Sequence, residues 1–413
     1  MLTAAWVLPV EGPPIREGAV VIEDGRLAWV GARSDVPSAF RRVPRRDFPR
    51  GLLLPGLVNA HCHVQLIPIS SGLCPGSEFV PWVRGLIAAV AEWSSEEIDR
   101  TTRAGLQEVA AAGITTVAHV SAAPRLAPFL ESPLRAVVFH EVLGFPEARA
   151  EGQLAVARAW LDGAGRGLVG QSGRVGIGIA AHAPYSVSAS LLRGLVALAR
   201  ERDLPFSIHL AETREEATFL ATGGGPFRDL LRERGGWDDA WSPPGMGPVA
   251  YAERLGLLDA HGLAVHLNYL EPGDLDRLRR GRLTACWCPG AHRWFGHPAH
   301  PAAAMLAAGI PLALGTDSLA SNDALDLLRE MRLAAATQPE VPPAAWLRAA
   351  TLGGAEALGL AHEIGSLRPS KAADLTVVEP FPEMEADPHR ALLSEAARVR
   401  FACVNGRPVR TWD

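Results

Sequence analysis

Eight short apolar segments alternate with helix-like segments through the middle of the chain, and this alternation constrains the fold more than any other feature. The intervening segments are rich in Ala, Leu and Arg, and one of them opens at Ser94 or Ser95 ahead of acidic residues, as helix N-caps do. Eight strands that alternate with helices fit a parallel barrel of the TIM type better than an open sheet. The expected strands are residues 51–60, 113–120, 134–144, 174–186, 204–213, 261–270, 282–288 and 310–318.

Both ends of the chain resemble short strands more than helices. Residues 19–31 contain Asp24-Gly25 and residues 399–412 contain Asn405-Gly406, and both pairs are signals for a hairpin turn between apolar segments. We expect the two ends to pair into one small domain. The predicted architecture is a composite β-sandwich from residues 1–55 and 365–413, and a barrel over residues 56–364.

Polar side chains end successive expected strands, where a barrel of this kind carries its chemistry. Because side chains two apart on a strand point the same way, His61 and His63 would enter one small volume. Together with His209 and Asp317 they can hold one divalent ion and leave room for a water. Such an ion lowers the pKa of water from about 15.7 to about 7. The polar residues at or near strand ends are His61, His63, His119, His140, Glu141, His182, His209, His266 and Asp317.

Two further residues fit the same chemistry. Glu212 follows His209 by three positions and can donate a proton to a ring nitrogen or a leaving group. His266 can hydrogen-bond the water or a developing oxyanion. The alternatives are a satisfied core histidine for His209 and a turn or helix-capping aspartate for Asp317. We expect His119 and His140 to be structural.

Charge and cysteine content restrict the partners and the compartment. The formal net charge is −5, so the chain has no global attraction for nucleic acid or an anionic membrane. No run of 18 apolar residues occurs, and the five scattered cysteines form neither a disulfide framework nor the Cys-x-x-Cys pair of zinc nucleic-acid deaminases. We expect a cytoplasmic protein that acts on a small molecule without nucleic-acid or membrane partners, with a homodimer as the candidate assembly.

Four motifs occur in the order typical of the amidohydrolase superfamily: PGLVNAHCHV, AHAPYSVS, IHLAET and LGTDSLASN. The chain resembles the branch of cytosine, guanine and adenosine-type deaminases and triazine hydrolases, and within it aminodeoxyfutalosine deaminase-like proteins. This resemblance implies a distorted TIM barrel with one zinc or iron ion, zinc being the first choice. By position it implies His61, His63, His209 and Asp317 as ligands.

The resemblance also implies roles in the reaction. Asp317 would take the water's proton, Glu212 would carry it to the ring, His266 would orient the water or the intermediate, and His182 would contact substrate. Other branches bridge two metals through a carbamylated barrel lysine, but the only lysine here is Lys371, in the expected sandwich. Where the family commonly has Cys-Pro-x-Ser-Asn, this chain has residues 288–292 as Cys-Pro-Gly-Ala-His.

The leading functional hypothesis is an aminohydrolase that releases ammonia from a purine-like or related nitrogen heterocycle, aminodeoxyfutalosine-type nucleosides included. One alternative is an amide, lactam or chloro-group hydrolase with the same metal centre, and another is a catalytically silent scaffold. Candidate pocket residues for a flat ring with a polar appendage are Trp82, Arg84, Trp294 and Phe295.

Overall fold

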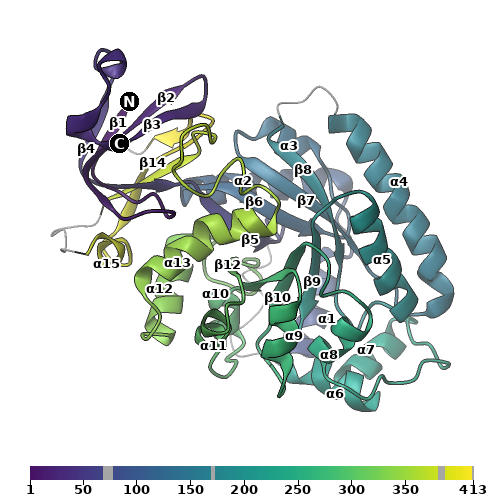
Figure 1. Ribbon diagram of the computed structural model, residues 1–413. Coiled ribbons are helices and arrows are strands. Elements are labelled where there is room, and N and C mark those ends of the chain that lie inside the picture. The colour runs from purple at the N-terminus through teal and green to yellow at the C-terminus, as the bar shows by residue number, and fades with distance from the viewer. Residues whose placement is uncertain (68–77, 169–172, 380–386, 412–413) are drawn as a thin grey trace.

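The computed structural model describes residues 1–67, 78–168, 173–379 and 387–411, and it shows a barrel beside a smaller sheet (Figure 1). Eight parallel strands form the barrel sheet in sequence order, with each strand paired to the next along the chain. The predicted fold class, a TIM-type barrel with a small sheet domain, is confirmed. The barrel strands are β5 (Leu57–Cys62), β6 (Ile114–Ser121), β7 (Arg135–Val142), β8 (Val175–Ala181), β9 (Phe206–Leu210), β10 (Gly262–His266), β11 (Leu283–Trp287) and β12 (Leu312–Leu314).

The first and last strands meet just beyond β12, which closes the barrel. The backbone N–H groups of Thr316 and Asp317 both donate to the carbonyl oxygen of His61 at 3.1 Å, and the His63 N–H donates to the Asp317 carbonyl oxygen at 3.3 Å. The Asn59 amide adds a buried hydrogen bond of 2.7 Å to Thr316 Oγ1. These bonds hold the ends of β5 and β12, and therefore His61, His63 and Asp317, against each other.

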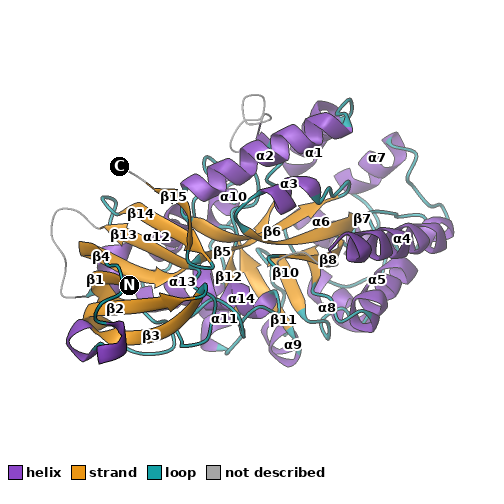
Figure 2. Cartoon of the chain, turned by 90° about the horizontal axis from the view of Figure 1, so that it is seen from above, coloured by secondary structure: helices purple, strands orange, loops and turns teal. Residues whose placement is uncertain are grey.

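The helices cover the outside of the barrel, as the alternation predicts (Figures 1 and 2). Ser94 caps α2 through a complete capping box with Glu97, so the expected N-cap is present and is the first of the two candidate serines. The helices are α1 (Phe79–Val90), α2 (Ser95–Ala111), α3 (Ala127–Glu131), α4 (Ala150–Leu168), α5 (Ala189–Glu201), α6 (Arg214–Thr222), α7 (Pro226–Glu233), α8 (Pro248–Arg254), α9 (Asp274–Arg280), α10 (Pro289–Trp294), α11 (Ala302–Ala307), α12 (Leu327–Thr337), α13 (Pro343–Arg348), α14 (Gly354–Ala357) and α15 (Pro388–Leu392).

Both chain ends join in a seven-stranded mixed sheet, in the order β15-β14-β13-β4-β1-β2-β3. Its strands are β1 (Leu2–Val7), β2 (Ile15–Glu23), β3 (Arg26–Ala32), β4 (Arg46–Pro55), β13 (Leu375–Glu379), β14 (Arg398–Val404) and β15 (Arg407–Thr411). Asp24-Gly25 joins β2 to β3 and Asn405-Gly406 joins β14 to β15, all four with positive φ, so both predicted hairpin turns are present. The residue limits of the two domains stay a prediction.

Residues 51–60, expected as one strand, belong to two strands in different sheets. β4 ends at Pro55 in the seven-stranded sheet, and β5 begins at Leu57 in the barrel. Between them, the N–H of Gly56 donates to the Asp374 carbonyl oxygen, and a Cβ at Gly56 would lie 2.1 Å from Thr115 Oγ1. The chain therefore changes sheets at a proline, which cannot donate to a ladder, and a glycine, which fits the close contact.

A buried ion pair joins the sheet to the N-terminal end of the barrel. Arg135, at the start of β7, donates through Nε to Asp374 Oδ2 at 2.9 Å, and both side chains are almost fully buried. Lys371 lies in the part of the chain that leads into β13, where its Nζ donates to Ser366 Oγ at 2.6 Å, so the single lysine belongs to none of the barrel strands.

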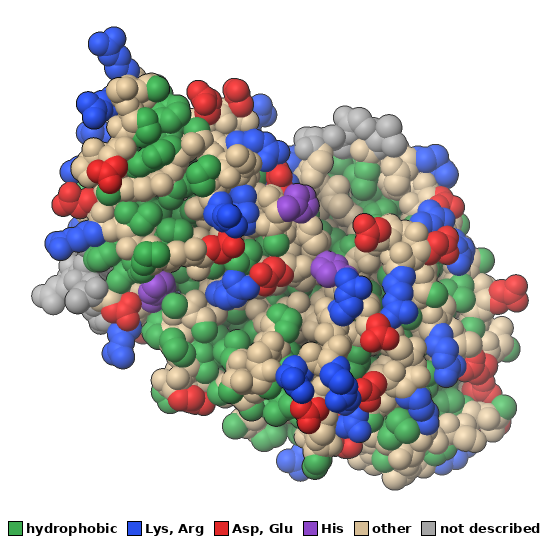
Figure 3. Space-filling view, in the orientation of Figure 1, with side chains coloured by type: hydrophobic (Ala, Val, Ile, Leu, Met, Phe, Trp, Pro, Cys, Tyr) green, Lys and Arg blue, Asp and Glu red, His purple; other side chains and the backbone are tan. Residues whose placement is uncertain are grey.

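The surface offers no obvious binding patch of one charge on the face seen in Figure 3, where acidic and basic side chains are interspersed. Among the described residues, no helix combines the length and the apolar character that crossing a membrane requires.

Candidate active site

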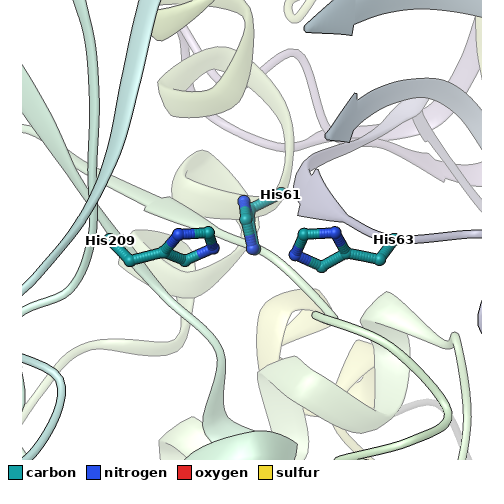
Figure 4. A group of neighbouring side chains, drawn as sticks. All are labelled: His61, His63 and His209. Atoms are coloured by element: carbon teal, nitrogen blue, oxygen red, sulfur yellow. The ribbon is translucent and has the colours of Figure 1, made fainter. Parts of the chain in front are cut away.

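Three histidine rings converge at the C-terminal end of the barrel. One ring nitrogen from each of His61, His63 and His209 lies within 4.8 Å of the other two. The His61 ring stands between the other two, with its centroid 5.0 Å from each (Figure 4). His61 lies near the end of β5, His63 directly follows that strand and His209 lies near the end of β9, so strands about 150 residues apart in sequence build one site.

A shift in the pairing of β5 brings the two β5 histidines inside the barrel. The register between β5 and β6 shifts between Asn59 and Cys62. Val58 and Ala60 belong to one buried cluster, whereas Cys62 belongs to the other. Because neighbouring side chains on a regular strand face opposite ways, this irregularity is what adds His61 and His63 to the face of Val58 and Ala60.

Backbone carbonyl groups orient two of the three rings. His63 Nδ1 donates to the Val120 carbonyl oxygen at 2.9 Å, and His209 Nδ1 donates to that of His182 at 2.7 Å. In each ring Nε2 then carries the free lone pair, a common arrangement for a metal-binding histidine. His61 is fully buried, and neither of its nitrogens has a hydrogen-bond partner among the described residues.

Asp317 supplies a carboxylate beside these rings. Its Oδ1 lies 3.8 Å from His61 Nε2 and 3.7 Å from His63 Nε2, while Ser321 Oγ donates to Oδ2 at 2.7 Å. Asp317 has a positive φ of 57°, a costly conformation that the barrel-closing hydrogen bonds maintain.

Burial keeps the imidazoles neutral. It lowers the pKa of His63 and of His209 to about 4, and it lowers the pKa of His61 still further below its usual range, with the neighbouring histidines adding to that effect. Burial also raises the pKa of Asp317, which the Ser321 hydrogen bond opposes. Three neutral nitrogens and a carboxylate, with two unpartnered atoms on His61, fit a divalent metal ion.

Glu212 and His266 lie next to this centre. Glu212 Oε1 is 3.4 Å from His266 Nε2, and both side chains are buried. The Glu212 backbone is held on both sides, because its N–H donates to Glu216 Oε2 and its carbonyl oxygen accepts from Asn268 Nδ2. Burial, and next the Asp317 charge, raise the pKa of Glu212 well above its usual range.

A cavity of about 720 Å³ opens above the centre. His182 lines it and donates through Nδ1 to Ser186 Oγ at 2.6 Å. Trp82 also lines it, but its indole N–H donates to the Ala320 carbonyl oxygen, so only its ring is available to a ligand. The other polar lining side chains include His63, Gln65, Glu141, His209, Glu212, His266 and Asp317, and the outer wall is largely apolar, with Leu66, Phe79, Val83, Leu86, Ile87, Val90, Phe227 and Leu230.

The structure does not bring the remaining candidates to this cavity. Arg84 makes a bidentate ion pair with Glu233 on the surface, at 2.8 and 2.9 Å. Trp294 is buried, Phe295 packs on Trp82, and neither belongs to the described lining. Substrate contacts of Arg84 and Trp294 stay predictions without a supporting contact.

Sequence reasoning assigned no role to several buried polar residues. Glu216 accepts the N–H groups of Ala211 and Glu212, and His292, at the departure from the family motif, bonds through Nδ1 to Asn268 Oδ1 at 3.1 Å. Glu141 lines the cavity, whereas its neighbour His140 packs on Trp160. Residues on β7 are buried on both faces, so no hydrophobic pattern in the sequence shows which of the pair points inward.

Comparison with known proteins matches the whole chain. The model of the amidohydrolase family matches residues 52–409. The 5-methylthioadenosine/S-adenosylhomocysteine deaminase of Moorella thermoacetica is 30% identical, over 97% of this chain and 91% of that one. An adenosine deaminase from Xanthomonas campestris with bound zinc superimposes with a TM-score of 0.81 at 26% identity, covering 98% of this chain and 92% of that one. Helicobacter pylori aminofutalosine deaminase shares the fold, with a TM-score of 0.82 at 24% identity and 99% coverage of both chains.

Proposed function

Because the chain belongs to the amidohydrolase family, we propose that it is a deaminase that releases ammonia from an adenosine-like nucleoside. It is a hydrolase of carbon–nitrogen bonds other than peptide bonds, and it uses a divalent metal. One ion, zinc in preference to iron, would be held by His61, His63, His209 and Asp317. The observation that carries the proposal is the meeting of these four side chains with Glu212 and His266, all of which except the fully buried His61 line one cavity.

The metal ligands supply the first part of the chemistry. When bound, the ion would act as a Lewis acid that lowers the pKa of water to about 7. Asp317 would help to hold the ion through Oδ1, which lies toward the histidines, and would also take up the proton of the attacking water, while Ser321 holds Oδ2.

Glu212 and His266 serve the proton transfers to the substrate. A deaminase must protonate the ring nitrogen beside the carbon under attack and then the departing amine. The raised pKa of Glu212 keeps a proton available at neutral pH, and His266 at 3.4 Å restrains the carboxyl group that carries it. Burial lowers the pKa of His266 well below its usual range, so its neutral ring adds no positive charge to the site.

The cavity supports a substrate that extends beyond a bare ring. Its floor is polar and its outer wall, formed in part by α1 and α7, is apolar. A flat base can reach Glu212 while a non-polar substituent packs on Phe79, Trp82 and Phe227. The relatives named for 5-methylthioadenosine and S-adenosylhomocysteine support a nucleoside with a substituent on its sugar.

An ammonia-release assay on the zinc-loaded protein tests this function. The panel contains adenine, adenosine, 5′-methylthioadenosine, S-adenosylhomocysteine and an aminofutalosine-type nucleoside, with 6-chloropurine riboside included for chloride release. We expect ammonia from at least one nucleoside. Chloride release without any ammonia would favour the chloro-group hydrolase, and neither product from any nucleoside would contradict the proposal.

A further inference from the structure

We propose that Glu141 binds the sugar hydroxyl groups of the substrate, and that it thereby selects ribosylated heterocycles over bare ones. This inference rests on the proposed function and assigns a role to a residue outside the metal centre and the Glu212–His266 pair. Glu141 lies on β7, lines the cavity and is only 9% exposed. Val137 and Phe139 belong to the cluster inside the barrel, so the alternation of β7 turns Glu141 to the same interior.

The carboxyl group of Glu141 has no partner within the described protein. Its Oε1 is buried without a hydrogen bond, and no arginine or lysine of the described chain pairs with it. His209 Nδ1 lies 3.7 Å from Glu141 Oε1, but that nitrogen already donates to the His182 carbonyl oxygen at 2.7 Å. Buried polar groups in folded proteins nearly always have partners, so we infer that a ligand supplies the one that Glu141 lacks.

A second metal ion is a poor explanation for this group. One oxygen of Glu141 and one nitrogen each of His182 and His209 do lie within 4.8 Å of one another. However, His209 uses Nδ1 for the carbonyl and directs its other nitrogen toward His61 and His63. His182 Nδ1 is occupied by Ser186. Only one carboxylate and one imidazole nitrogen then remain, too few protein ligands for the usual metal sites.

The two remaining groups suit hydroxyl donors. Ser186 Oγ donates its proton to the Ala183 carbonyl oxygen, so it accepts from His182 Nδ1 and leaves His182 Nε2 as an acceptor. A carboxyl group on β7 and an imidazole acceptor just after the adjacent strand β8 match two neighbouring hydroxyl groups of one sugar ring. Neither group offers a positive charge to a carboxylate or a phosphate. β8 and β9 are adjacent as well, so a sugar here stays within reach of a base held by Glu212.

Steady-state kinetics on hydroxyl-deleted nucleosides test this role. Wild type, Glu141→Gln and Glu141→Ala are assayed in the zinc-loaded form with adenosine, 2′-deoxyadenosine and 3′-deoxyadenosine. Glu151→Gln, an exposed glutamate in the first turn of α4, serves as the matched control. We expect wild type to prefer adenosine over at least one deoxynucleoside by roughly 10-fold or more in kcat/KM, as sites that hydrogen-bond a hydroxyl do.

In both Glu141 variants we expect this preference to fall toward unity. For adenosine, kcat/KM should fall mainly because KM rises, and the zinc content should stay unchanged. Equal losses on all three nucleosides, an unchanged preference, or the loss of a second equivalent of metal would overturn the role. Calorimetric binding of inosine, 2′-deoxyinosine and 3′-deoxyinosine to the same proteins needs no turnover. If wild type deaminates none of the nucleosides, the proposed function fails, while the inosine series still decides whether Glu141 recognises the hydroxyl groups.

Discussion

Replacing Glu212 by glutamine should separate catalysis from stability. The substitution keeps the shape of the side chain and removes its proton. The backbone of residue 212 is held by Glu216 and by Asn268, not by its own carboxyl group, so the loop should keep its conformation. The zinc content should also be unchanged, because Glu212 is not one of the four side chains that meet at the metal centre.

The two expected effects have opposite signs. General acid–base catalysis contributes roughly 10²–10⁴-fold, so kcat should fall by that factor, or about 3–5 kcal/mol in the barrier. Burial and the charge of Asp317 raise the pKa of Glu212, so its ionisation opposes folding as the pH rises above the normal carboxyl range. Glutamine cannot ionise, and the free energy of unfolding at pH 7 should therefore stay level or increase.

Ammonia release and urea denaturation at pH 7 measure the two quantities, with zinc analysis on the same samples. Glu215→Gln makes the same chemical change three residues further along, outside the described lining of the cavity, and should leave all three values near wild type. A rate near wild type in Glu212→Gln would refute the proton-transfer role. A drop in stability together with zinc loss would show that the carboxyl group is structural.

Three further predictions concern the metal, the ion pair between the domains and a buried histidine. His61→Ala should reduce the zinc content to background in metal analysis, and full occupancy would mean that the ligands are wrongly assigned. Asp374→Asn leaves the charge of Arg135 buried without its ionic partner, so the free energy of unfolding measured in urea should fall by about 3–5 kcal/mol. The value of kcat should be retained, because this pair lies at the opposite end of β7 from the cavity. Burial lowers the pKa of His119 from 6.5 to about 3, so between these values the unfolded chain binds a proton that the folded chain does not, and stability falls as the pH falls. From this residue alone, a decrease from pH 7 to pH 5 should cost wild type ~2 kcal/mol, and His119→Leu should abolish that part of the loss; an identical pH dependence in the variant would contradict it.

Local signals in the sequence were enough for much of the fold. Asp24-Gly25 and Asn405-Gly406 adopt positive φ in the turns where they were expected, and Ser94 caps α2, because these features depend on a few neighbouring residues. The eight apolar segments predict a barrel because strands separated by helices have few other ways to bury both faces. The family motifs then identify the four expected ligands, which the structure brings together.

The tertiary structure decided which side chains enter the cavity. Regular alternation along β5 would place His61 on the face opposite Ala60, and only the register shift against β6 adds the two histidines to the interior. Glu141 shares β7 with His140, and Arg84 pairs with Glu233 from a helix about 150 residues away. When both faces of a strand are buried, its sequence carries no sign of which face is inside. By itself the sequence therefore determined the elements and the chemistry of their ends, while the register and the distant contacts determined how that chemistry is arranged.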